Sequence, residues 1–315
     1  MPTTSDPAAA QALRHRCQAY GLRIDSELEL PELAPADPAA DDGPADVRIV
    51  FGAVERDGPA DGSARAIGPI LWARPGALWL QVPGVAGFRV EDGERITVDP
   101  DPAADEDSLR LFLLGSALGA LLWQRGATVL HGNAVQVGEG VLVCVGASGA
   151  GKSTLAAGFA RRGHALLADD VVALDDAGRV QPGLARVRLW QDMVAQLGID
   201  SAQLRRVRPG LAKYTLPVLQ PVPQPLPLRW LYLLEAGERE EPVVTPVEGL
   251  KRFALLRAHA YRPRFVEGMG LAAQQLQACG RIAASVHVAR LERPRRGGDL
   301  DALIDRLLED TARHG

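Results

Sequence analysis

The clearest chemical signal in this sequence is a glycine-rich octapeptide that ends in lysine and serine. Residues 146–153 have the sequence GASGAGKS, which fits the pattern GxxxxGK[ST], and a threonine follows at position 154. In such a loop the glycines let backbone N–H groups surround phosphate oxygens, the lysine reaches the outer phosphates, and the next hydroxyl binds Mg²⁺. The pattern predicts a site for ATP and Mg²⁺, with Ser153 as a metal ligand. Its expected members are Gly146, Ala147, Ser148, Gly149, Ala150, Gly151, Lys152, Ser153 and Thr154.

The surroundings of this loop favour a phosphate site over an ordinary glycine-rich turn. An apolar, strand-like run precedes the loop at 141–145, and a helical run follows at 154–162 and ends before Gly163. A strand, a glycine-rich loop and a helix N-terminus together form an anion site. Lysine is also rare here, since only Lys152, Lys213 and Lys251 are lysines among the 35 basic residues. We expect Lys152 to take part in catalysis as well as binding.

Two adjacent acids follow the helix. The next apolar run, 164–170, ends in Asp169 and Asp170. A right-handed crossover returns the chain in the direction of the first strand, which brings both acids to the edge that carries the loop. One carboxylate, Asp170, can then bind Mg²⁺, and Asp169 can act as the general base toward a hydroxyl. The alternative is that Asp169 only accepts a hydrogen bond from a turn.

A histidine lies upstream on a predicted hairpin. If Val137 pairs with Val141 across the turn at 138–140, then His131 faces Ala147 in the phosphate loop. From there it could orient the catalytic aspartate or change its pKa, whereas a shift of one residue would turn it away. We count His131 among the catalytic candidates and expect His164 to be structural.

Basic residues downstream could stabilise the transferred phosphoryl group. Residues 251–264 contain five Lys or Arg and no acid, and residues 205–213 contain four and again no acid. Phosphoryl transfer requires cations around three charged oxygens. Lys213 and Arg262 are the candidates, with Arg188 ranked behind them. The alternative for each is a solvated basic surface.

The remaining patterns predict the elements that position these residues. Short β-branched or aromatic runs separated by turn residues occur at 47–52, 70–73, 77–82 and 95–99. Asp107 or Ser108 could cap a helix that extends to Gly126, and the run 299–310 predicts a final helix. The chain is therefore expected to be an α/β protein. Residues 1–104 would form a β-containing domain with a possible role in substrate or partner recognition, and residues 105–315 a phosphate-loop domain.

Composition excludes several classes of function. The chain has 315 residues, 47% of them hydrophobic and 23% charged, and its net charge of −4 argues against a nucleic-acid binder. The apolar stretch 109–123 is shorter than the roughly 20 residues that span a bilayer. Cys17, Cys144 and Cys279 have no disulfide or zinc spacing, and the first residues show no signal peptide. We expect a cytoplasmic protein without nucleic-acid or membrane partners, possibly a homo-oligomer.

The central residues resemble a known family. The run 131–174, with His-Gly before GASGAGKS and then Arg-Gly-His and Ala-Asp-Asp, is similar to the catalytic core of HPr kinase/phosphorylase. That family consists of bacterial protein-serine kinases whose fold is similar to phosphoenolpyruvate carboxykinase. The resemblance implies that Lys152 and Ser153 bind nucleotide and Mg²⁺, that Asp169 is the base, and that Asp170 assists the metal. It also implies that His131 neighbours the base.

Outside this core the chain departs from the bifunctional enzymes. Thr154 replaces their usual glutamate, and no counterpart of their phosphorylase loop follows, which favours the kinase direction alone. The segments 20–33, 186–200, 207–214 and 259–268 resemble HPr-kinase-related kinases of lasso-peptide maturation, which modify a serine near the C-terminus of a precursor. This resemblance implies a peptide or protein substrate with an acceptor serine. The alternatives are a kinase of free serine or another small hydroxy metabolite, and a non-catalytic nucleotide-dependent binding module.

Overall fold

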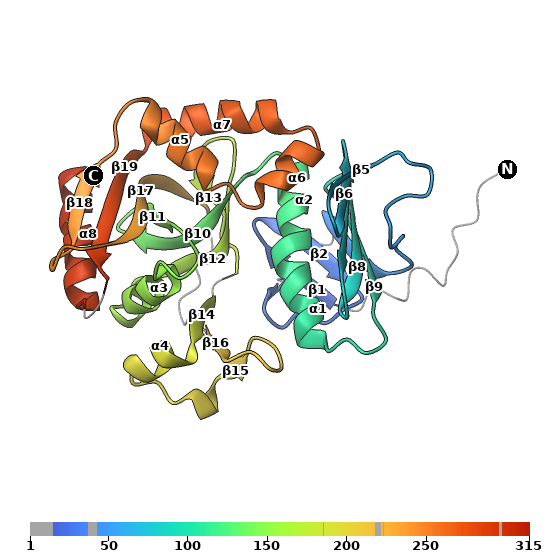
Figure 1. Cartoon of the computed structure of the whole chain (residues 1–315), viewed down its shortest axis with the longest axis horizontal. Helices are drawn as coiled ribbons and strands as arrows, with labels where there is room; N and C mark the ends of the chain where they lie inside the picture. Colours follow the sequence, from blue (N-terminus) through green and yellow to red (C-terminus); the bar gives the residue numbers. More distant parts are fainter. Residues whose placement is uncertain (1–14, 37–42, 185, 218–221, 223, 296–297) are drawn as a thin grey trace. The chain divides into compact units, whose positions relative to one another are not determined.

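The protein consists of two compact units (Figure 1). A computed structural model describes residues 15–36, 43–184, 186–217, 222, 224–295 and 298–315, so the residues tested above for a signal peptide lie outside the described part. The first unit comprises Met1–Arg125 with Gly268–Gly270, and the second comprises Gly126–Glu267 with Leu271–Gly315. This division falls after residue 125, whereas the sequence predicted a boundary after residue 104. The helical segment between these positions packs on strands of the first unit.

The first unit is built on one nine-stranded sheet with the order β3-β1-β2-β4-β9-β8-β7-β6-β5. The inner strands alternate buried and more exposed residues or contain runs of buried residues, whereas the two edge strands, residues 34–35 and 65–68, have no buried residue. Their bounds are β1 (His15–Ala19), β2 (Leu22–Ser26), β3 (Ala34–Pro35), β4 (Val47–Phe51), β5 (Arg65–Gly68), β6 (Leu71–Arg74), β7 (Ala77–Val82), β8 (Ala86–Glu91) and β9 (Arg95–Pro100). The predicted β-containing N-terminal domain is therefore confirmed.

A helical segment follows the sheet and differs from the prediction at its start. It consists of α1 (Glu106–Phe112), a π-helical turn η1 (Leu113–Ala117) and α2 (Leu118–Gln124). The predicted caps Asp107 and Ser108 are wrong, because Asp105 is the N-cap. The carboxylate of Asp105 accepts hydrogen bonds from the backbone N–H and the hydroxyl of Ser108, both at 2.8 Å. Within the described residues, no helix has the length and apolar character needed to cross a bilayer.

The second unit carries a seven-stranded sheet with the order β11-β10-β12-β13-β17-β19-β18. An additional parallel pairing of β11 with β17 joins five of these strands into a ring. The strands are β10 (Thr128–Val137), β11 (Gly140–Val145), β12 (Leu166–Leu174), β13 (Arg179–Val180), β17 (Leu226–Gly237), β18 (Val243–Pro246) and β19 (His287–Pro294). The fold is thus α/β, as predicted.

Helices cover both faces of this sheet. The helices α5 (Leu250–Ala258) and α7 (Ala272–Ser285) contribute to one apolar core cluster, and α6 (Pro263–Gly268) lies between them in the sequence. On the other face α3 (Lys152–Arg161) and α8 (Leu300–Arg313) form a second cluster with β11 and β17. The predicted final helix is therefore present as α8, and α3 carries the phosphate loop at its N-terminus.

A small third sheet belongs to the same unit and lies near α3 (Figure 1). Its strand order is β14-β16-β15, and it is accompanied by α4 (Gln191–Gln196) and a 3₁₀ turn η2 (Ser201–Gln203). The strands are β14 (Arg186–Trp190), β15 (Arg205–Arg206) and β16 (Lys213–Pro217). Val187, Leu189 and Tyr214 anchor this sheet in the cluster shared with α3 and α8.

The strand after α3 runs in the predicted direction but does not end where expected. β10 pairs antiparallel with both β11 and β12, so β11 and β12 point the same way with β10 between them. β12 continues through Asp169 and Asp170 to Leu174, and the prediction that it ends at the two acids is wrong.

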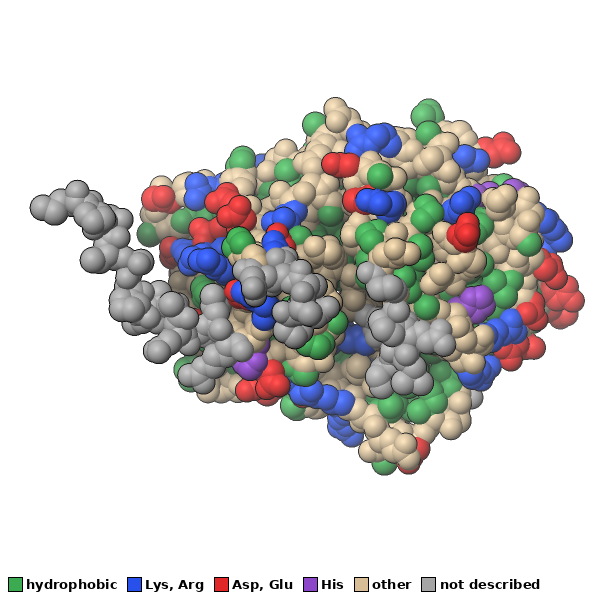
Figure 2. Space-filling model, turned by 180° about the vertical axis from the view of Figure 1, so that it is seen from behind, with side chains coloured by type: hydrophobic (Ala, Val, Ile, Leu, Met, Phe, Trp, Pro, Cys, Tyr) green, Lys and Arg blue, Asp and Glu red, His purple; other side chains and the backbone are tan. Residues whose placement is uncertain are grey.

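On the face shown in Figure 2, the described basic and acidic side chains are interspersed.

Candidate active site

The phosphate loop connects β11 to α3, as the sequence predicts. All residues of β11 are buried, which fixes the point where the loop begins. Gly146 has φ of 153°, and a Cβ atom there would lie 2.6 Å from the carbonyl oxygen of Leu234. Gly151 has φ of 104° and is the N-cap of α3. These two positions require glycine because any other side chain would clash with β17 or strain the backbone.

Lys152 lies at the base of the loop. Its ammonium group donates hydrogen bonds to the carbonyl oxygens of Gly146, at 2.8 Å, and Ala147, at 3.1 Å. Burial lowers the pKa of Lys152, and the charges of Asp170 and Asp169 oppose that effect. The lysine is therefore held beside the loop backbone, within the electrostatic field of both acids.

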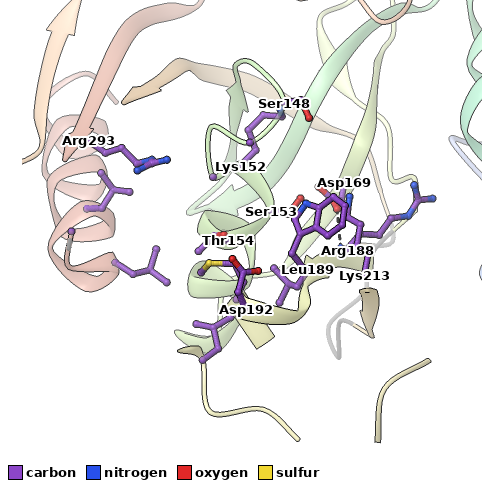
Figure 3. Close-up of a pocket in the computed structure, with 18 of the residues that line it drawn as sticks. Ser148, Lys152, Ser153, Thr154, Asp169, Arg188, Leu189, Asp192, Lys213 and Arg293 are labelled. Atoms are coloured by element: carbon purple, nitrogen blue, oxygen red, sulfur yellow. Dashed lines mark hydrogen bonds between the residues drawn. The ribbon is translucent and has the colours of Figure 1, made fainter. Parts of the chain in front are cut away.

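The loop opens into a groove of about 920 Å³ that belongs entirely to the second unit (Figure 3). The size is that of a typical small-molecule site. Most of the predicted site residues line it, from five different elements. They are His131, Ser148, Gly149, Gly151, Lys152, Ser153, Thr154, Asp169, Asp170, Arg188 and Lys213. Apolar side chains of α4 and α8, such as Met193 and Leu303, line other parts of the groove.

Asp169 and Asp170 line the same groove although they are adjacent in a strand. Successive side chains of a regular strand point to opposite faces. Asp170 has φ of 75°, in the left-handed region, and this irregularity breaks the alternation. The sequence prediction placed both acids at one edge by ending the strand there. The structure achieves the same result with a local backbone distortion inside the strand.

The two carboxylates have very different acidities. Asp169 is only 7% exposed, and burial, together with the charge of Asp170, raises its pKa to about 6. A hydrogen bond from the backbone N–H of Arg188 opposes this shift. Burial acts on Asp170 as well, but the hydrogen bond from His131 and the charges of Arg188, His131 and Lys213 lower its pKa to about 2. Asp170 is thus ionised at all ordinary pH values, while Asp169 can exchange a proton near neutrality.

His131 reaches the groove by a different register from the one predicted. Val137 pairs with Gly140, not with Val141, so the same register places His131 opposite Gly146. The predicted alignment with Ala147 is wrong by one residue. The imidazole nevertheless faces the groove, and its Nδ1 lies 3.2 Å from Asp170 Oδ1. His131 therefore contacts Asp170, whereas the resemblance had made it a neighbour of Asp169.

Of the basic candidates, Arg188 has the most direct contacts. Its backbone N–H donates to Asp169 Oδ2 at 3.2 Å, and its guanidinium lies 3.5 Å from Asp170 Oδ2. Lys213, opposite Trp190 in the pairing of β14 with β16, lines the groove with its ammonium group 5.5 Å from the centre of the Trp190 ring. Arg188, which the sequence ranked behind Lys213 and Arg262, lies beside both acids because of strand pairing that no local pattern reveals.

Two residues singled out in the sequence, Arg262 and His164, are not among the described residues that line the groove. The guanidinium of Arg262 lies over the rings of Tyr261 and Phe265. His164 packs edge-on against Phe159, and its Nδ1 lies 3.1 Å from the carbonyl oxygen of Gln136. This environment agrees with the structural role expected for His164.

Sequence analysis missed two residues of the loop region. Arg293, at the end of β19, donates a hydrogen bond from Nε to the carbonyl oxygen of Ala150 at 2.8 Å and lines the groove (Figure 3). Asn133 lies opposite Asp169 in the β10–β12 pairing, and its side-chain amide donates to the carbonyl oxygen of Lys152. Neither residue had a local signal in the sequence, because Arg293 is one of two arginines in the strand HVARLERP and Asn133 belongs to no recognisable motif.

A family model matches the part of the chain that carries the phosphate loop. Residues 125–198 match the family described as "HPr Serine kinase C-terminal domain", a segment that includes the phosphate loop and both acids. This part of the chain has an HPr kinase-related fold, which confirms the predicted resemblance of the central residues to the HPr kinase family. The solved structure of the Hpr(Ser) kinase/phosphatase from Coxiella burnetii is also similar, at 14% identity over 59% of this chain and 95% of that chain, with a TM-score of 0.29. The comparison with curated proteins gave no match.

Proposed function

We propose that this protein is an ATP-dependent kinase that transfers the γ-phosphoryl group to a serine hydroxyl of a peptide or protein. The observation that carries the proposal is the pair Asp169 and Asp170 in the groove of the phosphate loop, with pKa values displaced in opposite directions. A binding module would need one carboxylate at most for a metal. A second carboxylate that can accept a proton near neutrality is what a hydroxyl acceptor requires.

The residues can be assigned to the steps of the transfer. The loop amides and Lys152 hold the phosphates, and Asp169 accepts the proton of the acceptor hydroxyl. The acceptor oxygen then bonds to the γ-phosphorus while the bond from that phosphorus to the bridging oxygen breaks, and ADP leaves. Arg188 and Lys213 supply positive charge near the transferred group. His131 positions Asp170 through the 3.2 Å contact between them.

The residues present also fit Mg²⁺. Ser153 at the start of α3 and the ionised carboxylate of Asp170 provide the hydroxyl and carboxylate oxygens that this ion prefers. When bound, Mg²⁺ would act as a Lewis acid and neutralise the negative charge of the transferred phosphoryl group. The HPr kinase-related segment supports the assignment, because it contains both of these residues.

For the acceptor we propose a peptide serine, with the C-terminal region of a lasso-peptide precursor as the specific candidate. The support is the similarity of the segments 20–33, 186–200, 207–214 and 259–268 to kinases of that pathway. The groove residues all belong to the second unit, which leaves the first unit available for recognition of the acceptor or a partner.

An acceptor screen with γ-labelled ATP and Mg²⁺ tests this proposal. We expect label on peptides with a serine near the C-terminus and none on free serine. Asp169→Asn should retain ATP affinity and lose roughly two to four decades of turnover. If only free serine became labelled, the acceptor would be a small metabolite and not a peptide. Tight ATP binding without ADP release for any acceptor would favour a nucleotide-dependent binding module, and an unchanged rate in Asp169→Asn would remove that residue from its role.

A further inference from the structure

A second cluster of potential metal ligands lies outside the groove, at the C-terminal end of α8. His287 comes from the first position of β19, and Asp310 and His314 come from the last turn of α8 and its C-cap. One ligand atom of each side chain lies within 4.8 Å of the other two. None of the three residues lines the groove described above.

The side chains of this cluster are closely packed. His287 Nε2 lies 3.0 Å from Asp310 Oδ2. His314 Nδ1 lies 3.6 Å from Asp310 Oδ1 and 3.0 Å from the carbonyl oxygen of the same residue. The two imidazole rings are stacked, with centroids 4.0 Å apart and planes 13° from parallel. Two aromatic nitrogen donors and a carboxylate therefore converge on one small region.

A buried hydroxyl orients the carboxylate. Tyr232 OH donates a hydrogen bond to Asp310 Oδ2 at 2.8 Å, and the exposed fraction of the Asp310 side chain is only 6%. Among the described residues, the side chains that contact this carboxylate are Tyr232 and the two histidines, none of which has a permanent charge. A buried carboxylate is costly unless a positive group compensates it, and a cation at this point would do so.

We propose that His287, Asp310 and His314 form a binding site for a first-row divalent transition metal such as Zn²⁺. Imidazole nitrogens with one carboxylate are a common ligand set for this class of ion, whereas Mg²⁺ prefers oxygen ligands alone. Asp310 and His314 have the i, i+4 spacing that places two side chains on one helix face. Tyr232 acts as the outer partner that holds the ligating carboxylate.

The geometry requires only a small adjustment to bind the ion. Ligand atoms around a tetrahedral Zn²⁺ are about 3.3 Å apart, as follows from bond lengths near 2.0–2.1 Å. The present separations of up to 4.8 Å therefore have to shrink by roughly 1–1.5 Å. His314 is the residue that can move, since 39% of its side chain is exposed and it lies at the helix end.

A metal at this site would stabilise the position of α8, whose first residues line the groove. Asp299, Leu300, Asp301 and Leu303 at the start of α8 line the groove, while the proposed ligands lie at the other end of that helix or face it from β19. A metal that joins the end of α8 to β19 would stabilise the packing of this helix on the sheet. It would take no part in phosphoryl transfer, so this inference does not depend on the proposed kinase activity.

Metal titration of the full-length protein tests the inference. After chelator treatment, we expect one equivalent of Co²⁺ to bind with visible d–d absorption, Zn²⁺ to displace it, and Zn²⁺ to raise the melting temperature. His314→Gln, at a half-exposed helix end, should lower Co²⁺ affinity by at least ~100-fold, and Tyr232→Phe by about 10-fold. His164→Ala, which removes a histidine outside the cluster, should bind Co²⁺ as the original protein does.

Two comparisons make the result decisive. Ser153→Ala should weaken Mg²⁺-nucleotide binding and leave Co²⁺ affinity unchanged, which separates this site from the groove. Asp310→Asn retains the size of the side chain and should lose Co²⁺ binding while its circular dichroism still shows a folded protein. Absence of stoichiometric Co²⁺ and Zn²⁺ binding, or equal binding by His314→Gln and Asp310→Asn, overturns the proposal.

Discussion

The acidity of Asp169 determines how the proposed reaction should respond to pH. A general base must be ionised, and burial with the nearby charge of Asp170 raises the pKa of Asp169 to about 6. We expect kcat/KM for phosphorylation to rise tenfold per pH unit below about pH 6 and to level off above it. Initial rates at saturating Mg²⁺ between pH 5 and 8 measure this profile. A plateau that extends down to pH 5 would show that no group with this pKa limits the reaction.

The same residue should reduce the stability of the folded protein. An aspartate in the unfolded chain loses its proton near pH 3.8, whereas Asp169 in the folded protein keeps it up to about pH 6. The free energy of unfolding therefore falls as pH rises through this window, and the full cost is present above pH 6. Two pKa units correspond to at most about 3 kcal/mol. Asp169→Asn removes this cost, so we expect it to be more stable than the original protein at pH 8.

Urea denaturation of both proteins at pH 8 and at pH 4 measures this difference. The stabilisation by Asp169→Asn should be largest at pH 8 and should nearly vanish at pH 4, where the carboxyl group is protonated in the folded protein. A gain in stability combined with a loss of turnover is typical of a functional residue. If Asp169 were only a hydrogen-bond acceptor for Arg188, the variant would be neutral or less stable at both pH values.

At the scale of the element, the distortion of β12 at Asp170 is what brings the two acids together. The left-handed conformation of Asp170 favours glycine over alanine once the carboxylate is removed. We expect Asp170→Gly to be more stable than Asp170→Ala by about 1 kcal/mol in urea denaturation. The matched pair Val171→Gly and Val171→Ala should show the opposite order, because glycine weakens a regular strand. If glycine were the more stable substitution at both positions, or alanine at both, the left-handed backbone conformation would not be a special property of position 170.

Local patterns in the sequence predicted the phosphate loop, the following helix and the direction of β12. These features depend on residues close together in the chain, such as Gly151 and Lys152 at the start of α3. The hairpin register was off by one residue because the turn has two central residues, with Gly138 at φ of 56° in the first. Glycine at that position is typical of a type II′ turn and was the available signal.

The features that sequence analysis missed depend on long-range pairing. Arg188 contacts both acids only because the segment after β13 folds back over β12. Arg293 reaches the loop because β19 runs parallel to β17, which itself pairs with β11. Neither proximity is encoded in hydrophobic periodicity or in local turn residues, so sequence alone could not rank these arginines.

At the scale of the whole molecule, the division into two units predicts where nucleotide should act. Every described residue that lines the groove belongs to the second unit. A ligand that binds only the folded state stabilises it, by about 2.7 kcal/mol at 100 times its Kd. In hydrogen exchange of the full chain, we expect Mg²⁺-ATP at this level to slow the most protected amides of β11 and β17 by roughly 100-fold.

Amides of β7, β8 and β9 should exchange at their original rates, because these strands belong to the core of the first unit. Lys152→Ala is the control, since it should abolish the nucleotide-dependent protection of β11 and β17 when each protein is compared with its own nucleotide-free state. Equal protection of β7–β9 and β11 by nucleotide would mean that both units open in one cooperative step. Protection restricted to the second unit would instead show that the groove residues, and the sheet that positions them, form an independently stabilised body.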